Sequence, residues 1–149
     1  MGADLYIGSV YAASRGKWET RFAEAVKARD ASKPGSAEFK RYHRRAFYCY
    51  DKMCGEGYFR DPYNDGDVLW KFGLSWWGDV IPRLGEDGAL SVAEIQRLLE
   101  KLWECRETFW KNLELLDKDD RRYFERRAQA LEKFLKLAIK LNEPIDCSL

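Results

Sequence analysis

The strongest constraint on the fold is a long helical periodicity in the C-terminal third of the chain. Ser91 followed by Glu94 is a capping-box pair, in which a hydroxyl and a carboxylate each satisfy a free amide of a first helical turn. Apolar residues then recur at spacings of three and four over residues 95–116 and again over 124–139. The sequence therefore predicts two long amphipathic helices in this part of the chain.

The connection between these two helices is the run DKDD at residues 117–120, with Asp119 or Asp120 expected to cap the second helix. Pro144 lies beyond the end of the second helix. Two long helices joined by so short a turn must run antiparallel. We therefore predict a C-terminal antiparallel helical hairpin.

The N-terminal half carries two further helical stripes, over residues 17–31 and 36–54, separated by the turn-forming run SKPGS. Residues 4–11 alternate apolar and polar side chains and predict one short N-terminal strand or an extended arm. A second, weaker strand candidate lies at residues 88–92. Together these patterns predict an all-α fold, a single-domain bundle of about five helices over residues 1–149.

The charge and cysteine content narrow the class of protein. The 26 Lys and Arg side chains almost balance the 25 Asp and Glu, so a net charge of +1 argues against a strongly basic nucleic-acid binder. No apolar run approaches the roughly 18 residues that cross a bilayer. The N-terminus lacks the features of a signal peptide, and the 4 cysteines lack metal-site or disulfide-scaffold spacing. We expect a cytoplasmic protein with no membrane association and no cofactor.

The centre of the chain is dense in aromatic residues, with the sequence YFRDPYNDGDVLWKFGLSWW at residues 58–77. One interpretation is a short helix, capped by Asp65 or Asp67, that packs beneath the longer helices. The other is that part of the cluster stays exposed and binds another protein. Because neighbouring residues on a helix point about 100° apart, one of Trp76 and Trp77 is expected to be partly exposed.

The same segment contains part of a calcium-loop pattern, with Asp61, Tyr63, Asp65 and Gly66 at the first, third, fifth and sixth places. The pattern fails at the twelfth place, where Phe72 replaces the bidentate glutamate. We therefore expect a turn and no metal site.

No sequence motif for nucleophilic, nucleotide-dependent or zinc-dependent catalysis is present. We therefore expect a non-enzymatic protein that binds another macromolecule, most simply another protein, as an adaptor, regulator or inhibitor. Because interfaces favour Trp, Tyr and Arg, the expected binding surface consists of Trp70, Trp76, Trp77, Tyr63, Arg44, Arg45, Arg122 and Arg126.

Three alternatives remain open. A hydrolase or a binder of small polar ligands or metals would use Asp61, Asp65, Asp67 and His43. A nucleic-acid binder would use the arginine-rich faces of the second and last helices. The wide apolar face of the helix that contains Trp103 and Trp110 also suits a homodimer.

Overall fold

The computed structural model describes residues 2–54 and 57–149. The chain divides into two compact units: a two-helix unit, Gly8–Gly57, and a sheet-containing unit, formed by Met1–Ile7 and Tyr58–Leu149. Each unit is described here by itself. The expectation of a single domain over residues 1–149 stays a prediction.

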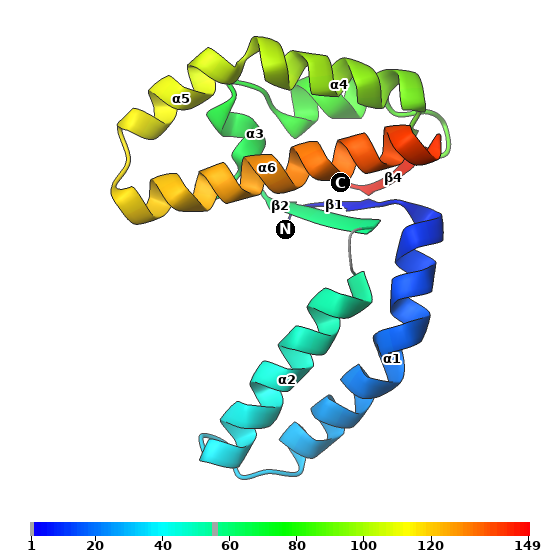
Figure 1. The fold of residues 1–149 in the computed structure, drawn as a ribbon, viewed down its shortest axis with the longest axis vertical. Helices are drawn as coiled ribbons and strands as arrows, with labels where there is room; N and C mark the ends of the chain where they lie inside the picture. Colours follow the sequence, from blue (N-terminus) through cyan, green and yellow to red (C-terminus); the bar gives the residue numbers. More distant parts are fainter. Residues whose placement is uncertain (1, 55–56) are drawn as a thin grey trace. The chain divides into compact units, whose positions relative to one another are not determined.

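The two-helix unit consists of α1 (Gly8–Asp30) and α2 (Ala37–Cys54), which pack against each other (Figure 1). The turn between them contains Gly35 at φ +80°, a conformation that favours glycine. Ser36 caps α2, because its Oγ accepts a hydrogen bond from the Phe39 amide at 3.1 Å. Helix α1 begins well before Lys17, so the second half of the strand predicted at residues 4–11 is helical.

The sheet-containing unit carries four short strands: β1 (Gly2–Tyr6), β2 (Tyr58–Pro62), β3 (Ala89–Leu90) and β4 (Ile145–Ser148). They form an antiparallel sheet in the order β2-β1-β4-β3. The short N-terminal strand is therefore confirmed, but the all-α prediction is wrong, because the fold is mostly helical with a small sheet. Strands this short give too few alternating residues for a clear period-two signal.

Helix α6 (Lys118–Leu141) packs on this sheet, with the rings of Phe59 and Phe134 6.1 Å apart. Its buried stripe consists of Phe124, Leu131, Phe134, Leu135 and Ala138. The helix begins at Asp117, whose carboxylate accepts hydrogen bonds from the amides of residues 119 and 120 at 2.9 Å. The cap is therefore neither of the two aspartates that the sequence suggested.

The single helix expected over residues 92–116 is divided into α4 (Val92–Glu104) and α5 (Arg106–Glu114). Cys105, at φ −89° and ψ 4°, interrupts the helix, and the two segments change direction there (Figure 1). Ser91 caps α4 as predicted, because its Oγ accepts from the Glu94 amide at 3.3 Å. None of the described helices combines the length and the apolar character needed to span a membrane.

The aromatic centre contains three short helical segments: α3 (Val68–Lys71), the π-helical turn η2 (Trp76–Val80) and the 3-10 turn η3 (Ile81–Arg83). Helix α3 ends early because Gly73 adopts φ +73°, which a longer helix cannot contain. Before α3, the Asn64 side chain accepts a hydrogen bond from the Gly66 amide at 2.8 Å. This contact confirms the turn predicted around Gly66.

The buried carboxylate of Asp61 holds these segments to the sheet. Asp61 lies on β2 and is fully buried. It accepts hydrogen bonds from the amides of Val68 (3.0 Å) and Leu69 (3.3 Å) at the start of α3 and from the Trp76 indole (2.8 Å). Hydrogen bonds to a charged group contribute about 1.5–3 kcal/mol each, so this carboxylate fixes both α3 and η2.

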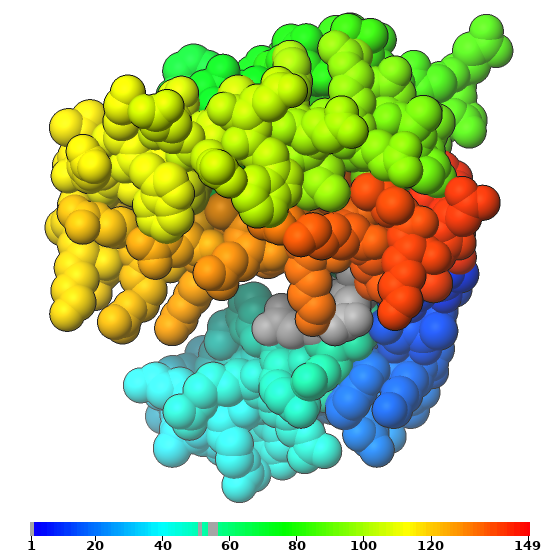
Figure 2. Space-filling view, turned by 45° about the horizontal axis from the view of Figure 1, so that its top comes forward, coloured from blue at the N-terminus to red at the C-terminus, as the bar shows by residue number. Residues whose placement is uncertain are grey.

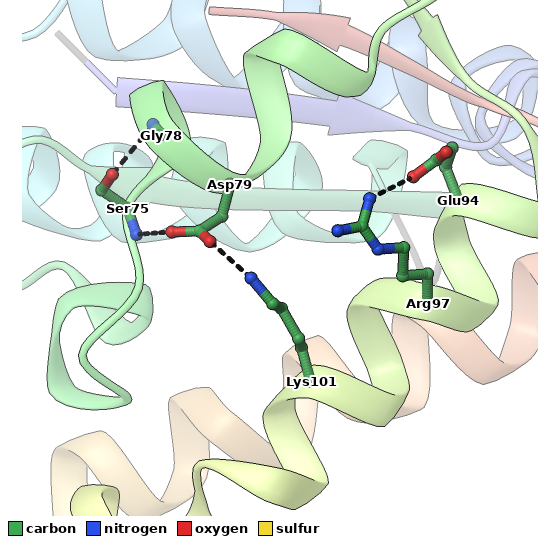
Figure 3. Close-up of polar contacts among 6 residues, drawn as sticks. All are labelled: Ser75, Gly78, Asp79, Glu94, Arg97 and Lys101. Atoms are coloured by element: carbon green, nitrogen blue, oxygen red, sulfur yellow. Dashed lines mark hydrogen bonds and ion pairs between the residues drawn. The ribbon is translucent and has the colours of Figure 1, made fainter.

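A second set of polar contacts joins η2 to α4 (Figure 3). The Asp79 carboxylate accepts from the Ser75 amide and from Lys101 of α4, both at 2.9 Å. The Ser75 hydroxyl in turn accepts from the Gly78 amide. The hydrogen bond from Lys101 is the largest cause that lowers the pKa of Asp79, so this carboxylate stays charged.

The two adjacent tryptophans differ sharply in exposure, which gives a first testable prediction. Trp76 is 1% exposed and Trp77 is 65% exposed. We expect Trp76→Ala to lower the free energy of unfolding by about 3–5 kcal/mol, because it opens a cavity and removes a donor from Asp61. Trp77→Ala should change it by no more than about 0.5 kcal/mol. Urea unfolding monitored by circular dichroism measures both.

Trp76→Phe separates the two causes, since it keeps most of the ring and removes the indole N–H. Trp76→Phe should lower the free energy of unfolding less than Trp76→Ala does, by about 1–3 kcal/mol. Equal losses for Trp76→Ala and Trp77→Ala would contradict the difference in burial.

Candidate functional site

The sheet-containing unit has a concave groove between α4–α5 and α6, with a volume of about 500 Å³. Its floor includes Phe72, which follows α3, and Phe109 of α5, whose rings stack at 4.3 Å. Figure 2 shows the yellow-green and yellow side chains of α4 and α5 bordering the orange side chains of α6. The groove is lined by Phe72, Leu99, Leu102, Trp103, Arg106, Phe109, Trp110, Glu125, Ala128, Gln129 and Glu132.

The wall formed by α4 and α5 is aromatic. Trp103 and Trp110 are 49% and 50% exposed, although both line the groove. The Trp110 ring meets the buried Phe109 ring edge to face at 5.4 Å, and the Arg106 guanidinium lies 5.2 Å from the Trp103 ring centre. These contacts hold two large indoles in place while leaving half of each available to another molecule.

The wall formed by α6 is polar and acidic. Glu125, Ala128, Gln129 and Glu132 follow the spacing i, i+3, i+4 and i+7, so they lie on one face of the helix. Glu132 forms an ion pair with Lys136. Glu125 forms no ion pair with any residue that the structure describes. The groove therefore joins an aromatic wall, which also carries the Arg106 cation, to a wall on which Glu125 is unpaired among the described residues and Glu132 is paired with Lys136.

The expected aromatic surface is only partly exposed. Trp70 and Trp77 are exposed, whereas Trp76 is buried and bonded to Asp61, so it cannot be a surface contact. The Tyr63 ring lies 6.0 Å from the Trp77 ring. The Tyr63 hydroxyl is buried without a hydrogen-bond partner among the described residues, and burial is the largest cause that raises its pKa.

The four expected arginines fall in different units. Arg122 and Arg126 lie exposed on α6 of the sheet-containing unit, and Arg44 and Arg45 lie exposed on α2 of the two-helix unit. Other arginines contact aromatic rings, among them Arg106, which lines the groove, and Arg127, whose guanidinium lies 4.4 Å from the Phe59 ring centre.

The acidic residues proposed for the hydrolase alternative do not form a free catalytic set. Asp61 is engaged by three N–H donors, and Asp65 is an exposed turn residue. His43 belongs to the other unit, where its ring stacks on Phe39. In the described part of the chain, no group of three or more His, Cys, Asp or Glu side chains is arranged to hold a metal ion.

Asp67 has the most altered acidity among these groups. It caps α3 by accepting from the Trp70 amide at 3.1 Å. Burial, followed by a hydrogen bond with the Asp61 carboxyl, raises the pKa of Asp67 to about 7. A proton on Asp67 removes the repulsion between two adjacent carboxylates.

At the level of sequence, Trp103 and Trp110 were expected only as part of a wide apolar face that suits a homodimer, and the residues of the α6 wall were missed. Trp103 and Trp110 widen the apolar face of their helix beyond a single stripe, which indicates a second contact on that side. Glu125, Gln129 and Glu132 look like ordinary solvated positions of an amphipathic helix. They line the groove only because α6 lies beside α5 in the fold.

Comparisons with protein-family models, with curated proteins and with solved structures give no match for this chain. Its function is therefore argued from the geometry above.

The raised pKa of Asp67 predicts a pH dependence of stability. The pKa is about 7 in the fold and has its usual value of 3.8 in the unfolded chain, so the folded state holds one more proton between these values. The stabilisation is complete below pH 3.8 and is lost as the pH rises through 7. We expect the wild type to lose more stability between pH 5 and pH 8 than Asp67→Asn, which cannot ionise.

Urea unfolding of both proteins between pH 5 and pH 8 measures how the free energy of unfolding of each changes with pH. Because the two proteins share all other titrating groups, the contributions of those groups cancel when the two changes are subtracted. Identical pH profiles would contradict the raised pKa.

Proposed function

We propose that this protein is a non-enzymatic binding protein that holds an amphipathic helix of a partner protein in the groove between α4–α5 and α6. The observation that carries the proposal is the pairing of two half-exposed indoles on one wall with two glutamates on the other. Binding surfaces favour Trp at their centres, where a partner side chain excludes water from the ring.

The spacing of the residues along the α6 wall favours a helix as the occupant of the groove. Glu125 and Glu132 on one wall are seven residues apart on the continuous helix α6, whereas Trp103 and Trp110 on the opposite wall belong to α4 and α5, on either side of the break at Cys105. Seven residues correspond to about two helical turns, or roughly 10 Å. A docked helix presents its apolar anchors at the same interval, at positions i, i+3 or i+4, and i+7.

The charge of the groove specifies the partner helix further. An occupant that faces the indoles with apolar side chains turns its flank toward Glu125, Gln129 and Glu132. A basic flank complements the carboxylates of Glu125 and Glu132, and an acidic flank is repelled by them. The proposed partner segment is therefore an amphipathic helix with Leu-like anchors on one side and Lys or Arg beside them.

This binding suits an adaptor, a regulator or an inhibitor that acts in the cytoplasm. The described cysteines Cys49, Cys105 and Cys147 are free thiols, and burial raises the pKa of Cys147 to about 12, which keeps it protonated and unreactive. Thiols of this kind agree with a reducing compartment. Trp70 and Trp77 are also exposed on the sheet-containing unit, but they do not line the groove.

The proposal is tested with two synthetic helical peptides of about 18 residues that share a leucine face and differ in flank, one with Lys and one with Glu. We expect the Lys peptide to bind in calorimetry and the Glu peptide to bind at least about tenfold more weakly. Replacing Trp103 and Trp110 by Ala should weaken binding of the Lys peptide at least about tenfold. Replacing Glu125 and Glu132 by Gln should remove most of the difference between the two peptides.

The matched control is the double variant Trp70→Ala with Trp77→Ala, which removes two exposed indoles of the same unit outside the groove and should bind like the wild type. Equal affinity of the wild type for both peptides contradicts the proposal. A wild-type dimer that the Trp103 and Trp110 variant dissociates also contradicts it, because a second copy would then occupy the groove.

A further inference from the structure

The near-neutral total charge hides a strong separation of charge between the two units. Residues 8–57 contain 11 Lys and Arg and 6 Asp and Glu, a formal charge of +5. The rest of the chain contains 15 Lys and Arg and 19 Asp and Glu, a formal charge of −4. A total charge of +1 does not favour a nucleic-acid partner, but the charge of +5 on the two-helix unit does.

The positive charge of this unit is concentrated on one face of α2. At 100° per residue, Arg41, Arg44, Arg45, Tyr48 and Lys52 fall within an arc of about 100°. All five side chains are exposed, Tyr48 to 55%. The face thus places one aromatic ring among four cations.

Helix α1 continues this face. The Trp18 ring meets the Tyr48 ring edge to face, with their centres 6.0 Å apart. The Arg21 guanidinium lies 4.7 Å from the Trp18 ring centre, and the Lys52 ammonium lies 5.7 Å from the Tyr48 ring centre. We define the basic–aromatic face as Trp18, Arg21, Arg44, Arg45, Tyr48 and Lys52.

The cations of the basic–aromatic face are not neutralised within the described part of the chain. Among the described residues of the two-helix unit, ion pairs join Arg15 to Glu19 and Arg29 to Asp30, and neither pair includes a residue of this face. None of the four cations of the face forms an ion pair with a described residue. Their charge is available to an outside partner.

We propose that the basic–aromatic face binds single-stranded nucleic acid. Its four cations match the phosphates of a flexible strand, and the exposed Tyr48 ring, beside the half-buried Trp18 ring, offers a stacking surface to unpaired bases. Sites of this kind combine a positive track with aromatic side chains and show little sequence preference. The proposal is independent of the partner helix in the groove, because it uses only residues of the two-helix unit.

The arrangement favours this partner over a membrane surface or an acidic peptide. A helix that lies on a membrane separates its apolar and basic faces, so that one side inserts into the lipid. Here rings and cations share one face and touch one another. An acidic peptide would pair with the cations but would leave Trp18 and Tyr48 without a stacking partner.

The test measures fluorescence anisotropy of a labelled oligothymidine of about 30 nucleotides with the full chain. Four phosphate contacts predict that affinity falls roughly fiftyfold between 50 and 200 mM salt. The double variant Arg44→Ala with Arg45→Ala should bind at least about tenfold more weakly at low salt. Its affinity should then fall only roughly sevenfold between 50 and 200 mM salt, because two phosphate contacts remain. Tyr48→Ala should weaken binding at least about fivefold and leave the salt effect unchanged.

The matched control is Arg122→Ala with Arg126→Ala, which removes the same charge from the other unit and should change the affinity less than about twofold. Circular dichroism verifies that each variant is folded. Absence of binding at 50 mM salt, or an equal loss in the control variant, overturns the proposal. Equal competition by polyglutamate or by anionic vesicles also overturns it, since the face would then bind anions of any kind.

Discussion

The buried carboxylate of Asp61 is the contact on which the rest of the sheet-containing unit depends. Asp61 lies on the edge strand β2, and its side-chain oxygens accept hydrogen bonds from two amides at the start of α3 and from the indole of Trp76. An isolated charge in an apolar interior is costly unless donors surround it, and three N–H groups do so here. Because α3 is fixed in this way, Phe72 after it can stack on Phe109 and form the floor of the groove.

The two candidate surfaces differ in chemistry because the two units differ in charge. The sheet-containing unit is acidic, and its groove presents indoles opposite glutamates, which suits a basic amphipathic helix. The two-helix unit is basic, and its surface interleaves rings with cations, which suits a polyanion with flat bases. If both proposals hold, the chain brings a protein and a nucleic acid together, which is one physical basis for a regulatory role.

The sequence allowed prediction of features with local causes. Serine caps at 36 and 91, the helical stripes of α2 and α6, and the exposure of one of two adjacent tryptophans all follow from nearby residues. Features that need distant partners were missed. Asp61 resembled a turn residue or a metal ligand, because its burial requires β2 to pair with β1 and both α3 and Trp76 to contact its side chain. The groove requires α5, α6 and Phe72 to meet, and no local pattern encodes that meeting.

The most direct test of this account is the stability of Asp61→Ala compared with Asp65→Ala, four residues away in an exposed turn. Removing the buried acceptor leaves three donors unpaired, and we predict a loss of about 3–5 kcal/mol in the free energy of unfolding, against no more than about 0.5 kcal/mol for the control. If Asp61→Ala unfolds the chain, the milder Asp61→Asn should still fold and lose stability. Wild-type stability in both Asp61 variants would contradict the account.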